Sequence, residues 1–347
     1  MSLQISYYGI HPFPGNVSLG NYRRPDEYLY SCDQKRQMYR QMPYKSRDES
    51  KRNSYQPDTC HLRDHRESCV ASGSQDPRYL QSYANMFCRF IELYRGEGIP
   101  IDMVMYQNEA YSYTPYPGCA WTSEGTIRFN KDYLRPTLER EHPEVQLYLG
   151  TFNTNRLDYV EKTVDGLKDD VKGLGIQWEC REHLSALRAR YPALHLISSE
   201  SECGNGSMDW KAGEHTFHLL CDYIGRGCDE YFIWNFILQD NGESPWGWKQ
   251  NALIQVDSKT KRFRYTAEYY AVKHFSHLVP PGSRMTGYVS RDESKGTPVI
   301  VFVRPDGKRV VIAGNQTDQE RSATVGLGKK HLNMTMPPHS FHSYVEQ

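Results

Sequence analysis

The sequence predicts an α/β fold in which helices cover a parallel sheet, followed by a small antiparallel β domain. Two observations predict it. Between residues 77 and 279, short apolar runs alternate with amphipathic helical segments, a pattern typical of parallel strands that are buried on both faces. After Pro280 the helical period stops, and strand-like runs follow one another through a Pro305-Asp306-Gly307 turn, which indicates antiparallel pairing.

Residues 1–77 differ from the rest of the chain. From Ser31 to Asp76 the sequence is dense in charged residues and almost free of Val, Ile, Leu and Phe. Such a segment cannot bury enough apolar area to offset the entropy lost on ordering. We therefore expect residues 1–77 to be irregular or disordered, with at most a short helix.

The alternation begins with a helix over residues 77–95 that two glycines end. Its expected apolar face consists of Tyr79, Tyr83, Phe87, Phe90 and Leu93, spaced three and four residues apart. Further helices are expected in the first part of 123–143, with Ser123 as N-cap, and at 157–170, 181–192, 209–227 and 265–279. Strands are expected at 101–107, 145–152, 173–178, 194–200 and 228–236, then at 285–291, 297–316, 322–328 and 342–347.

Composition excludes several classes of protein. Lys+Arg and Asp+Glu both number 42, so no basic surface for nucleic acid is expected. No apolar run approaches the roughly 18–20 residues that a membrane span needs, and the N-terminus lacks the pattern of a signal peptide. The nine cysteines include no CxxC pair, which argues against a zinc site. We expect neither a metal nor a cofactor.

Polar residues stand where the expected strands end, which is where α/β barrels carry their function. Glu109 and Glu200 follow two of these strands, and Trp178 and Trp234 end two others. All six tryptophans lie between residues 121 and 248. A sugar presents a flat C–H face and a rim of hydroxyl groups, so it is bound by an aromatic platform with amide and carboxylate partners. The pattern therefore predicts a carbohydrate site.

Two carboxyl groups suffice to cleave a glycosidic bond when they flank it. We assign Glu109 as the acid/base and Glu200 as the nucleophile, with Asn108 holding the sugar hydroxyl beside the reacting carbon. Glu202 competes with Glu200 for the nucleophile role, and spacing alone does not separate them. Taken singly, each glutamate is more often a salt-bridge partner, so the prediction depends on the joint pattern.

From Tyr79 to Gln347 the chain resembles glycoside hydrolase family 30, the family of glucosylceramidases and β-1,6-glucanases. The matching stretches are QNEAYSYTPYPGCAWT, GIQWECREHLSALRARYP, ISSESECGNGSMDW, YFIWNFILQDNGESPWGWKQNALIQVD and YYAVKHFSHLVPPGSRM. The resemblance implies a (β/α)8 barrel with an attached β-sandwich and a double-displacement mechanism with retention. It implies Glu109 as acid/base and favours Glu200 over Glu202 as nucleophile. Implied substrate contacts are Asn108, Trp178, Trp234, Asn251 and Trp246.

The chain departs from the family pattern before the Gln107-Asn108-Glu109 motif. The family has about three further βα units there, and it commonly has Pro where this chain has Ala110. The expected architecture is therefore part of a TIM barrel, about strands 4 to 8, with a C-terminal antiparallel β-sandwich. The expected domains are an irregular segment 1–77, a catalytic barrel 78–279 and a sandwich 280–347.

The expected function is hydrolysis of β-glucosidic bonds in glucosylceramide-like or β-1,6-glucan substrates. The alternative is an incomplete, inactive barrel that at most binds glycans; an endo-xylanase is favoured less, since nothing marks a pentose. The expected partner is a carbohydrate or glycolipid, with no nucleic acid and no membrane span. The family implies a secreted or lysosomal protein, and four Asn-X-Ser/Thr sequons agree with it: Asn16, Asn205, Asn315 and Asn333.

Overall fold

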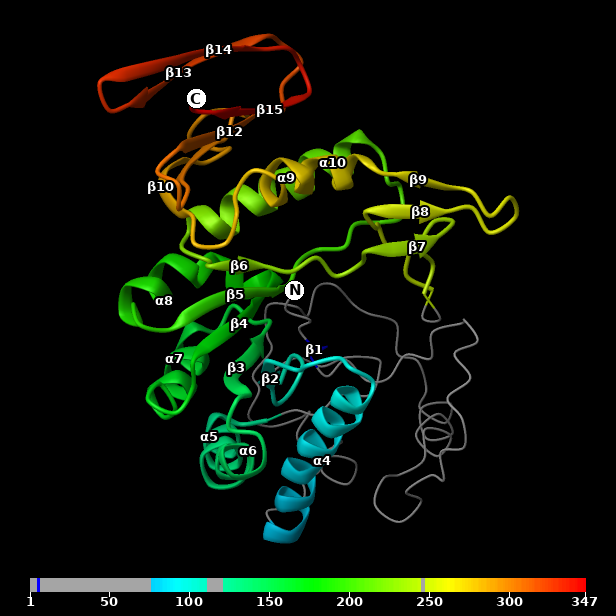
Figure 1. Ribbon diagram of the computed structural model, residues 1–347, viewed down its shortest axis with the longest axis vertical. Helices are drawn as coiled ribbons and strands as arrows, with labels where there is room; N and C mark the ends of the chain where they lie inside the picture. Colours follow the sequence, from blue (N-terminus) through cyan, green and yellow to red (C-terminus); the bar gives the residue numbers. More distant parts are fainter. Residues whose placement is uncertain (1–4, 7–75, 111–120, 245–246) are drawn as a thin grey trace, which may run out of the picture. The chain divides into compact units, whose positions relative to one another are not determined.

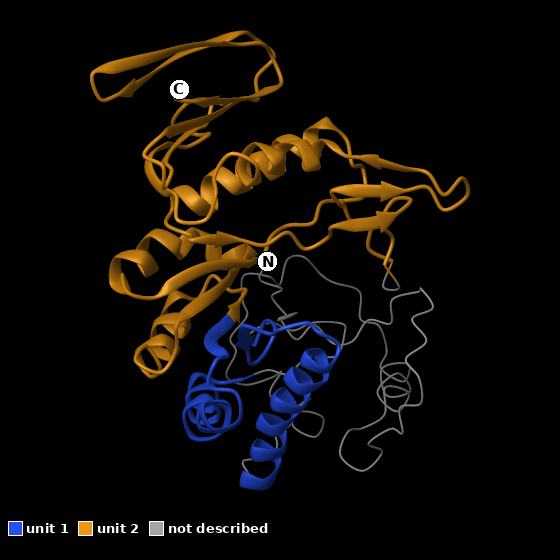
Figure 2. Ribbon diagram, in the orientation of Figure 1, with its two compact units in different colours: residues 1–150 blue, residues 151–347 orange. Residues whose placement is uncertain are grey.

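The computed structural model of the chain describes residues 5–6, 76–110, 121–244 and 247–347 (Figure 1). The chain divides into two compact units, residues 1–150 and 151–347 (Figure 2), and each is described by itself. Most of the segment that was expected to be irregular lies outside the described residues. Within it, Ile5–Ser6 forms a short strand, β1, where no strand is expected.

Unit 1 contains short parallel strands and the helices that connect them. Strand β2 pairs in parallel with β1 through Val104 and Ile5, and with β3 through Met103 and Gln146. All three residues of β2 are buried. The elements after β1 are α4 (Pro77–Gly96), β2 (Met103–Met105), α5 (Ser123–Phe129), the π-helix η2 (Asn130–Leu134), α6 (Arg135–Glu141) and β3 (Gln146–Phe152), which extends past the unit boundary at residue 150.

Helix α4 begins where the sequence predicts, but its buried face differs from the expected one. Asp76 is the N-cap and accepts a hydrogen bond from the backbone N–H of Arg78, and Pro77 occupies the first turn. Tyr79 is 55% exposed. The residues that face the core are Leu80, Ala84, Phe87, Cys88 and Ile91. The tyrosines lie at the edge of the face because their hydroxyl groups need partners, as Tyr83 shows by donating to Tyr106 O.

The helical segment after residue 121 is longer than expected. Thr122, rather than Ser123, is the N-cap, and its side chain accepts from Gly125 N. Helix continues through η2 into α6 up to Glu141. A proline usually ends a helix, but the π-helical turn restarts the register so that Pro136 falls in the first turn of α6, where its missing N–H is not needed.

Unit 2 begins with the βα pattern that the sequence predicts. Strands β4, β5 and β6 pair in parallel in that order, and β4 and most of β5 are buried, as expected for strands that are covered on both faces. These elements are β4 (Gly173–Gln177), the 3-10 helix η3 (Trp178–His183), α8 (Leu184–Arg190), β5 (His195–Glu200), α9 (Trp210–Gly225) and β6 (Glu230–Tyr231), with α7 (Leu157–Asp165) preceding them.

The strand expected at 228–236 is wrong in length. Only Glu230 and Tyr231 pair as β6, because the following residues, Ile233 to Asn235, line a pocket instead of extending the sheet. A three-stranded sheet that the sequence did not predict follows. It consists of β7 (Ile237–Gln239), β8 (Ile254–Val256) and β9 (Phe263–Tyr265), and it leads into α10 (Ala267–Ser276).

The C-terminal part is antiparallel, as the sequence predicts. Strands β10, β11, β12 and β15 form one sheet in that order, and β13 and β14 form a second. The turn at Pro305-Asp306-Gly307 joins β11 to β12, with Gly307 at φ +81°. Strand β14 is the one element here that was not expected. The strands are β10 (Arg284–Val289), β11 (Val299–Val303), β12 (Arg309–Asn315), β13 (Arg321–Leu327), β14 (Lys330–Met336) and β15 (Ser340–Val345).

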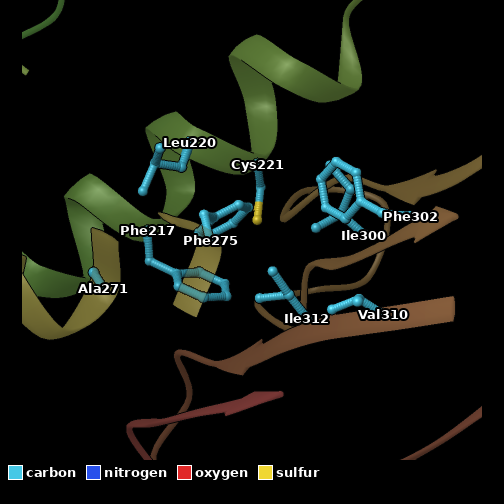
Figure 3. Close-up of a cluster of buried hydrophobic side chains, with 9 residues drawn as sticks. All are labelled: Phe217, Leu220, Cys221, Ala271, Phe275, Ile300, Phe302, Val310 and Ile312. Carbon is cyan, nitrogen blue, oxygen red and sulfur yellow. The ribbon is translucent and has the colours of Figure 1, made fainter. Parts of the chain in front are cut away.

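Helices α9 and α10 share one apolar core with the four-stranded sheet (Figure 3). Phe217 is fully buried in it and stacks on Phe341 of β15 with ring centroids 4.5 Å apart. Gly213 lets the two helices approach, because a Cβ there would lie 2.7 Å from Ala267 Cβ. The buried members are Phe217, Leu220, Cys221, Ala271, Phe275, Ile300, Phe302, Val310 and Ile312. The end of the barrel segment and the sandwich are therefore packed as one body.

Candidate active site

Glu200, the last residue of β5, is held by two neutral hydrogen-bond donors. The indole Nε1 of Trp178 donates to Oε1 at 3.1 Å, and Gln177 Nε2 donates to Oε2 at 3.2 Å. Gln177 also donates to Thr151 Oγ1 at 2.8 Å. The side chain is only 3% exposed. Donors to both oxygens fix the orientation of a carboxylate and stabilise its charge, because hydrogen bonds to a charged group are the stronger ones.

Trp178 occupies a strained backbone conformation. Its φ is +20°, a region that costs a residue with a side chain about 1–3 kcal/mol and that persists only where neighbours enforce it. Asn153 Oδ1 accepts a hydrogen bond from the next backbone N–H, that of Glu179, at 3.1 Å. The Trp178 ring meets the Trp234 ring edge to face, with centroids 6.4 Å apart and planes at 69°. The two indoles thus form an aromatic corner beside Glu200.

Glu202, two residues further on, has basic partners. Its carboxylate lies 3.6 Å from Arg181 Nη1 and 3.4 Å from His215 Nε2. Burial alone would raise the pKa of Glu202, but His215 and the Arg181 guanidinium outweigh burial and lower it. Glu202 therefore stays ionised and forms an ion pair with Arg181.

A pocket opens beyond the ends of β5 and β6, next to Trp234. It contains Glu268 of α10, whose Oε1 accepts from Thr216 Oγ1 at 3.0 Å. Burial raises the pKa of Glu268 to about 7, against the opposing effect of Thr216 and Asn251. The lining residues are Ser201, Glu202, Cys203, Thr216, Tyr231, Ile233, Trp234, Asn235, Asn251, Ala252, Leu253 and Glu268.

Asn251 organises the loop that follows Glu200. Its Oδ1 accepts from Gly206 N at 2.7 Å and from Met208 N at 3.4 Å, and its own backbone N–H donates to Cys203 O at 2.6 Å. Gly204 has φ +71°, and a Cβ there would lie 2.3 Å from Asn251 Nδ2. The resemblance implies Asn251 as a substrate contact. In the structure Asn251 is 4% exposed, and its side-chain oxygen is bound to backbone N–H groups.

In unit 1, Glu109 follows β2 at a bend. Its φ is +48° and it is 7% exposed, so its backbone is strained in the same sense as that of Trp178. The next residue, Ala110, accepts a hydrogen bond from Trp121 N at 2.7 Å. Trp121 packs edge to face on Tyr106 with centroids 5.2 Å apart. Aromatic packing therefore fixes the segment that carries Asn108 and Glu109.

The structure groups Glu200, Trp178 and Trp234 and places Asn251 at the neighbouring pocket. Trp246 lies outside the described residues. Gln177 and Thr151 also stand at expected strand ends, but the sequence analysis assigned neither of them a role at the Glu200 site. Glu268 carried no such signal, because it lies inside a helix. Among the described residues, no cluster of His, Cys, Asp or Glu is arranged to hold a metal ion.

Comparison with known families decides the identity of the fold. The model of the glycosyl hydrolase family 30 TIM-barrel domain matches residues 63–279, and that of the family 30 β-sandwich domain matches residues 287–344. The chain belongs to glycoside hydrolase family 30. The expected architecture, part of a TIM barrel followed by a β-sandwich, is confirmed, and so is the expected class of enzyme family.

The curated relatives are distant in sequence, and they are longer than this chain. The chain is 26% identical over 295 residues to the lysosomal acid glucosylceramidase of Mus musculus. This alignment covers 77% of this chain and 56% of that protein. It is 22% identical over 248 residues to the endo-1,6-β-D-glucanase BGN16.3 of Trichoderma harzianum, covering 69% of this chain and 50% of that protein. The chain thus spans about half the length of the curated relatives it matches.

Solved structures agree on the fold. SrfJ from Salmonella typhimurium superposes with a TM-score of 0.69 at 25% identity, over 78% of this chain and 63% of that one. The endo-β1,6-glucanase BT3312 superposes with a TM-score of 0.68 at 23% identity, over 78% and 64%. No helix in the described part of the chain is long and apolar enough to cross a membrane.

Proposed function

We propose that this chain is the catalytic part of a retaining β-glycosidase that hydrolyses β-glucosidic bonds by double displacement. The observation that carries the proposal is the setting of Glu200. It ends a parallel strand, is buried, and has each carboxylate oxygen held by a side-chain donor. A nucleophile needs this orientation, since it must meet the anomeric carbon along one line of attack.

In the proposed first step, Glu200 attacks the anomeric carbon and forms a covalent glycosyl–enzyme, while Glu109 gives its proton to the departing oxygen. In the second step, Glu109 takes a proton from water, and the water displaces Glu200. Gln177 and Trp178 keep the Glu200 carboxylate aimed. Asn108 is proposed to bind the hydroxyl beside the reacting carbon, and the Trp178–Trp234 corner the C–H face of the sugar.

Family membership and the names of the relatives support glucosidic substrates. The mouse relative is a glucosylceramidase and the Trichoderma relative an endo-1,6-β-D-glucanase. We accordingly propose glucosylceramide-like lipids or β-1,6-glucans as substrates. A secreted or lysosomal location is proposed on the same ground, together with the expected division into segments 1–77, 78–279 and 280–347.

Trapping the covalent intermediate tests this proposal. The purified chain is incubated with an activated 2-fluoro-β-glucoside, digested with trypsin and analysed by fragment mass spectrometry. We expect one fluoroglucosyl adduct on the peptide Tyr191–Lys211, which contains both Glu200 and Glu202. Fragment ions between these two residues assign the adduct, and we expect it on Glu200. The Glu200→Gln variant serves as the matched control and should stay unlabelled.

Each other outcome is informative. An adduct on Glu202 would overturn the assignment of the nucleophile. A folded, monodisperse chain that takes no label would contradict the proposed activity. In that case, saturable binding of a β-glucan without turnover would support the alternative, a glycan-binding barrel.

A further inference from the structure

Trp178 and Arg181 belong to the same short helix, η3 (Trp178–His183), three residues apart. Trp178 begins η3 and donates to Glu200, and Arg181 follows one turn later. Since the backbone of Trp178 is strained at φ +20°, contacts elsewhere on η3 must hold it in place.

Arg181 reaches away from η3 to two other elements. Its Nη1 lies 3.6 Å from Glu202 Oε1 in the loop after β5, and its Nε lies 3.5 Å from Asp222 Oδ2 on α9. Its guanidinium carbon also lies 5.8 Å from the ring centroid of Tyr223. The side chains of the three ion-paired residues are only 21%, 26% and 6% exposed. Partly buried charges like these interact more strongly than exposed ones because water screens them less.

These contacts close a ring around the candidate nucleophile. One path runs from Arg181 through η3 to the Trp178 indole and on to Glu200. The other runs from Arg181 to Glu202 and back along two residues of chain to Glu200. Arginine suits the junction, because its planar guanidinium stays charged and can serve several partners at fixed angles. Lysine offers one point charge on a flexible stem and could hold only part of the ring.

We propose that Arg181 is a positioning residue for Glu200, which keeps the Trp178 N–H on the nucleophile by tying η3 to Glu202 and Asp222. This inference rests on the proposed function for its meaning, but its geometry can be tested without turnover. It assigns the second acidic residue of the Ser-Glu-Ser-Glu stretch to the support of the first. It also explains why η3 can hold a strained residue at its start.

The test is a spectrum of the full chain with ¹⁵N-labelled tryptophan. Each indole N–H gives its own peak, and loss of a peak in the Trp178→Phe variant assigns Trp178. The Glu200→Gln variant gives the position of that peak when the acceptor is no longer charged. In Arg181→Met we expect the Trp178 peak to move in the same direction as in Glu200→Gln, or to broaden beyond detection. In Arg181→Lys the Trp178 peak should lie between its positions in Arg181→Met and in the unmodified chain.

Arg226→Met is the matched control. Arg226 Nε lies 2.8 Å from Asp222 Oδ1, so this variant breaks an ion pair with the same carboxylate but keeps Arg181 and both of its acidic partners. Its Trp178 peak should keep its position. A folded Arg181→Met protein with an unmoved Trp178 peak would overturn the inference. If Arg181→Met does not fold, Glu202→Gln replaces it, because this variant removes the ion pair between Arg181 and Glu202. An unmoved Trp178 peak in Glu202→Gln would likewise overturn the inference.

Activity separates this inference from the proposed function. If the unmodified chain is labelled by the 2-fluoro-β-glucoside, Arg181→Met should lower kcat about ten- to a hundredfold and leave KM within a factor of two. An equal rise in KM with unchanged kcat would contradict a positioning role. If the unmodified chain takes no label, the proposed function fails, and the Trp178 peak still decides whether Arg181 holds η3.

Discussion

Glu200 and Glu202 stand two residues apart after β5, yet the structure gives them different kinds of partner. Glu200 accepts hydrogen bonds from the neutral donors Gln177 and Trp178, whereas Glu202 faces the basic side chains of Arg181 and His215. A carboxylate beside a guanidinium has part of its charge neutralised, so it attacks less readily. The structure thus adds a physical reason to prefer Glu200 as the nucleophile, where spacing alone did not separate the two.

We predict unequal effects of the two isosteric changes. Glu200→Gln should abolish labelling by the 2-fluoro-β-glucoside and lower kcat for an aryl β-glucoside at least a thousandfold, since the nucleophile is lost. Glu202→Gln should keep the label and lose about ten- to a hundredfold, because only positioning is impaired. Intact-protein mass and initial rates measure both. The reverse pattern, with the label lost only in Glu202→Gln, would contradict the assignment of Glu200 as the nucleophile.

The hydrogen bond from Trp178 to Glu200 predicts a coupling energy. In a double-mutant cycle of Trp178→Phe and Glu200→Gln, urea unfolding should show an interaction of about 1 kcal/mol, within a range of roughly 0.5–3 kcal/mol. Trp210→Phe provides the control pair, since Trp210 is 41% exposed and stacks on Phe341. Trp210→Phe and Glu200→Gln should be additive within about 0.5 kcal/mol. Equal coupling in both cycles would show that the hydrogen bond contributes nothing specific.

The sequence predicted those parts of the site that depend on local patterns. A mostly apolar run such as Leu194–Ile197 is typical of a buried strand, so the polar residues after it are expected at the strand end. The positions of Glu200 and Trp178 followed from this rule. The rule could not predict that Trp178 donates to Glu200, because the contact joins two strands.

Other features depend on three-dimensional packing alone. The prediction of the buried face of α4 was wrong. A tyrosine counts as apolar when a helical period is read from the sequence, although its hydroxyl group draws it to the edge of the face. Arg181 could pair with any of several acidic residues, and only the fold selects Glu202 and Asp222. Asn251 had a polar side chain in the right stretch, but nothing local showed that its oxygen turns to the Gly206 backbone.

Glu268 predicts a loss of stability as pH rises. Its folded-state pKa is about 7, raised by burial from the ordinary value of 4.5. The native state therefore holds a proton that the unfolded state releases between these two values, so the free energy of unfolding falls from about pH 4.5 to 7 and then levels off. At 1.36 kcal/mol per pKa unit, the full loss is about 3 kcal/mol.

Glu268→Gln should remove that loss. The amide oxygen can still accept from Thr216, and the side chain carries no charge at any pH. Urea unfolding at pH 5 and pH 8 measures the effect, and we expect the difference in stability between these pH values to shrink. Glu320→Gln is the control, because Glu320 is exposed, and it should leave the difference unchanged. An unaltered pH dependence in Glu268→Gln would show that burial of this carboxyl has no such cost.

Gly204→Ala tests the loop that follows the nucleophile. The change combines the strain of a side chain at φ +71° with a clash of 2.3 Å against Asn251 Nδ2. We expect a destabilisation of about 2–4 kcal/mol, from roughly 1–2 kcal/mol of backbone strain and at least 1 kcal/mol of overpacking. Gly307→Ala isolates the strain, since Gly307 has φ +81° with nothing within 4 Å of its Cβ position. Thermal unfolding measures the loss of stability in both variants. Equal losses would mean that Asn251 moves aside freely in Gly204→Ala.

The shared core of Figure 3 predicts how the chain opens. The two family models separate between residues 279 and 287, but Phe217 of α9 packs in the same core as Ile312 of β12. Phe217→Ala leaves a cavity there and should cost about 3–5 kcal/mol. Because the cavity borders both elements, amide hydrogen exchange should accelerate by a similar factor in peptides from α9 and from β11–β12.

Phe263→Ala is the control for this experiment, because Phe263 is 64% exposed, and its effect should stay within about 0.5 kcal/mol. Acceleration that is confined to α9 would mean that the sandwich opens independently of the helices. Joint acceleration would mean that α9, α10 and the sandwich form one cooperative unit. The loop between β5 and α9, which begins directly after Glu200, is then anchored to the sandwich through α9.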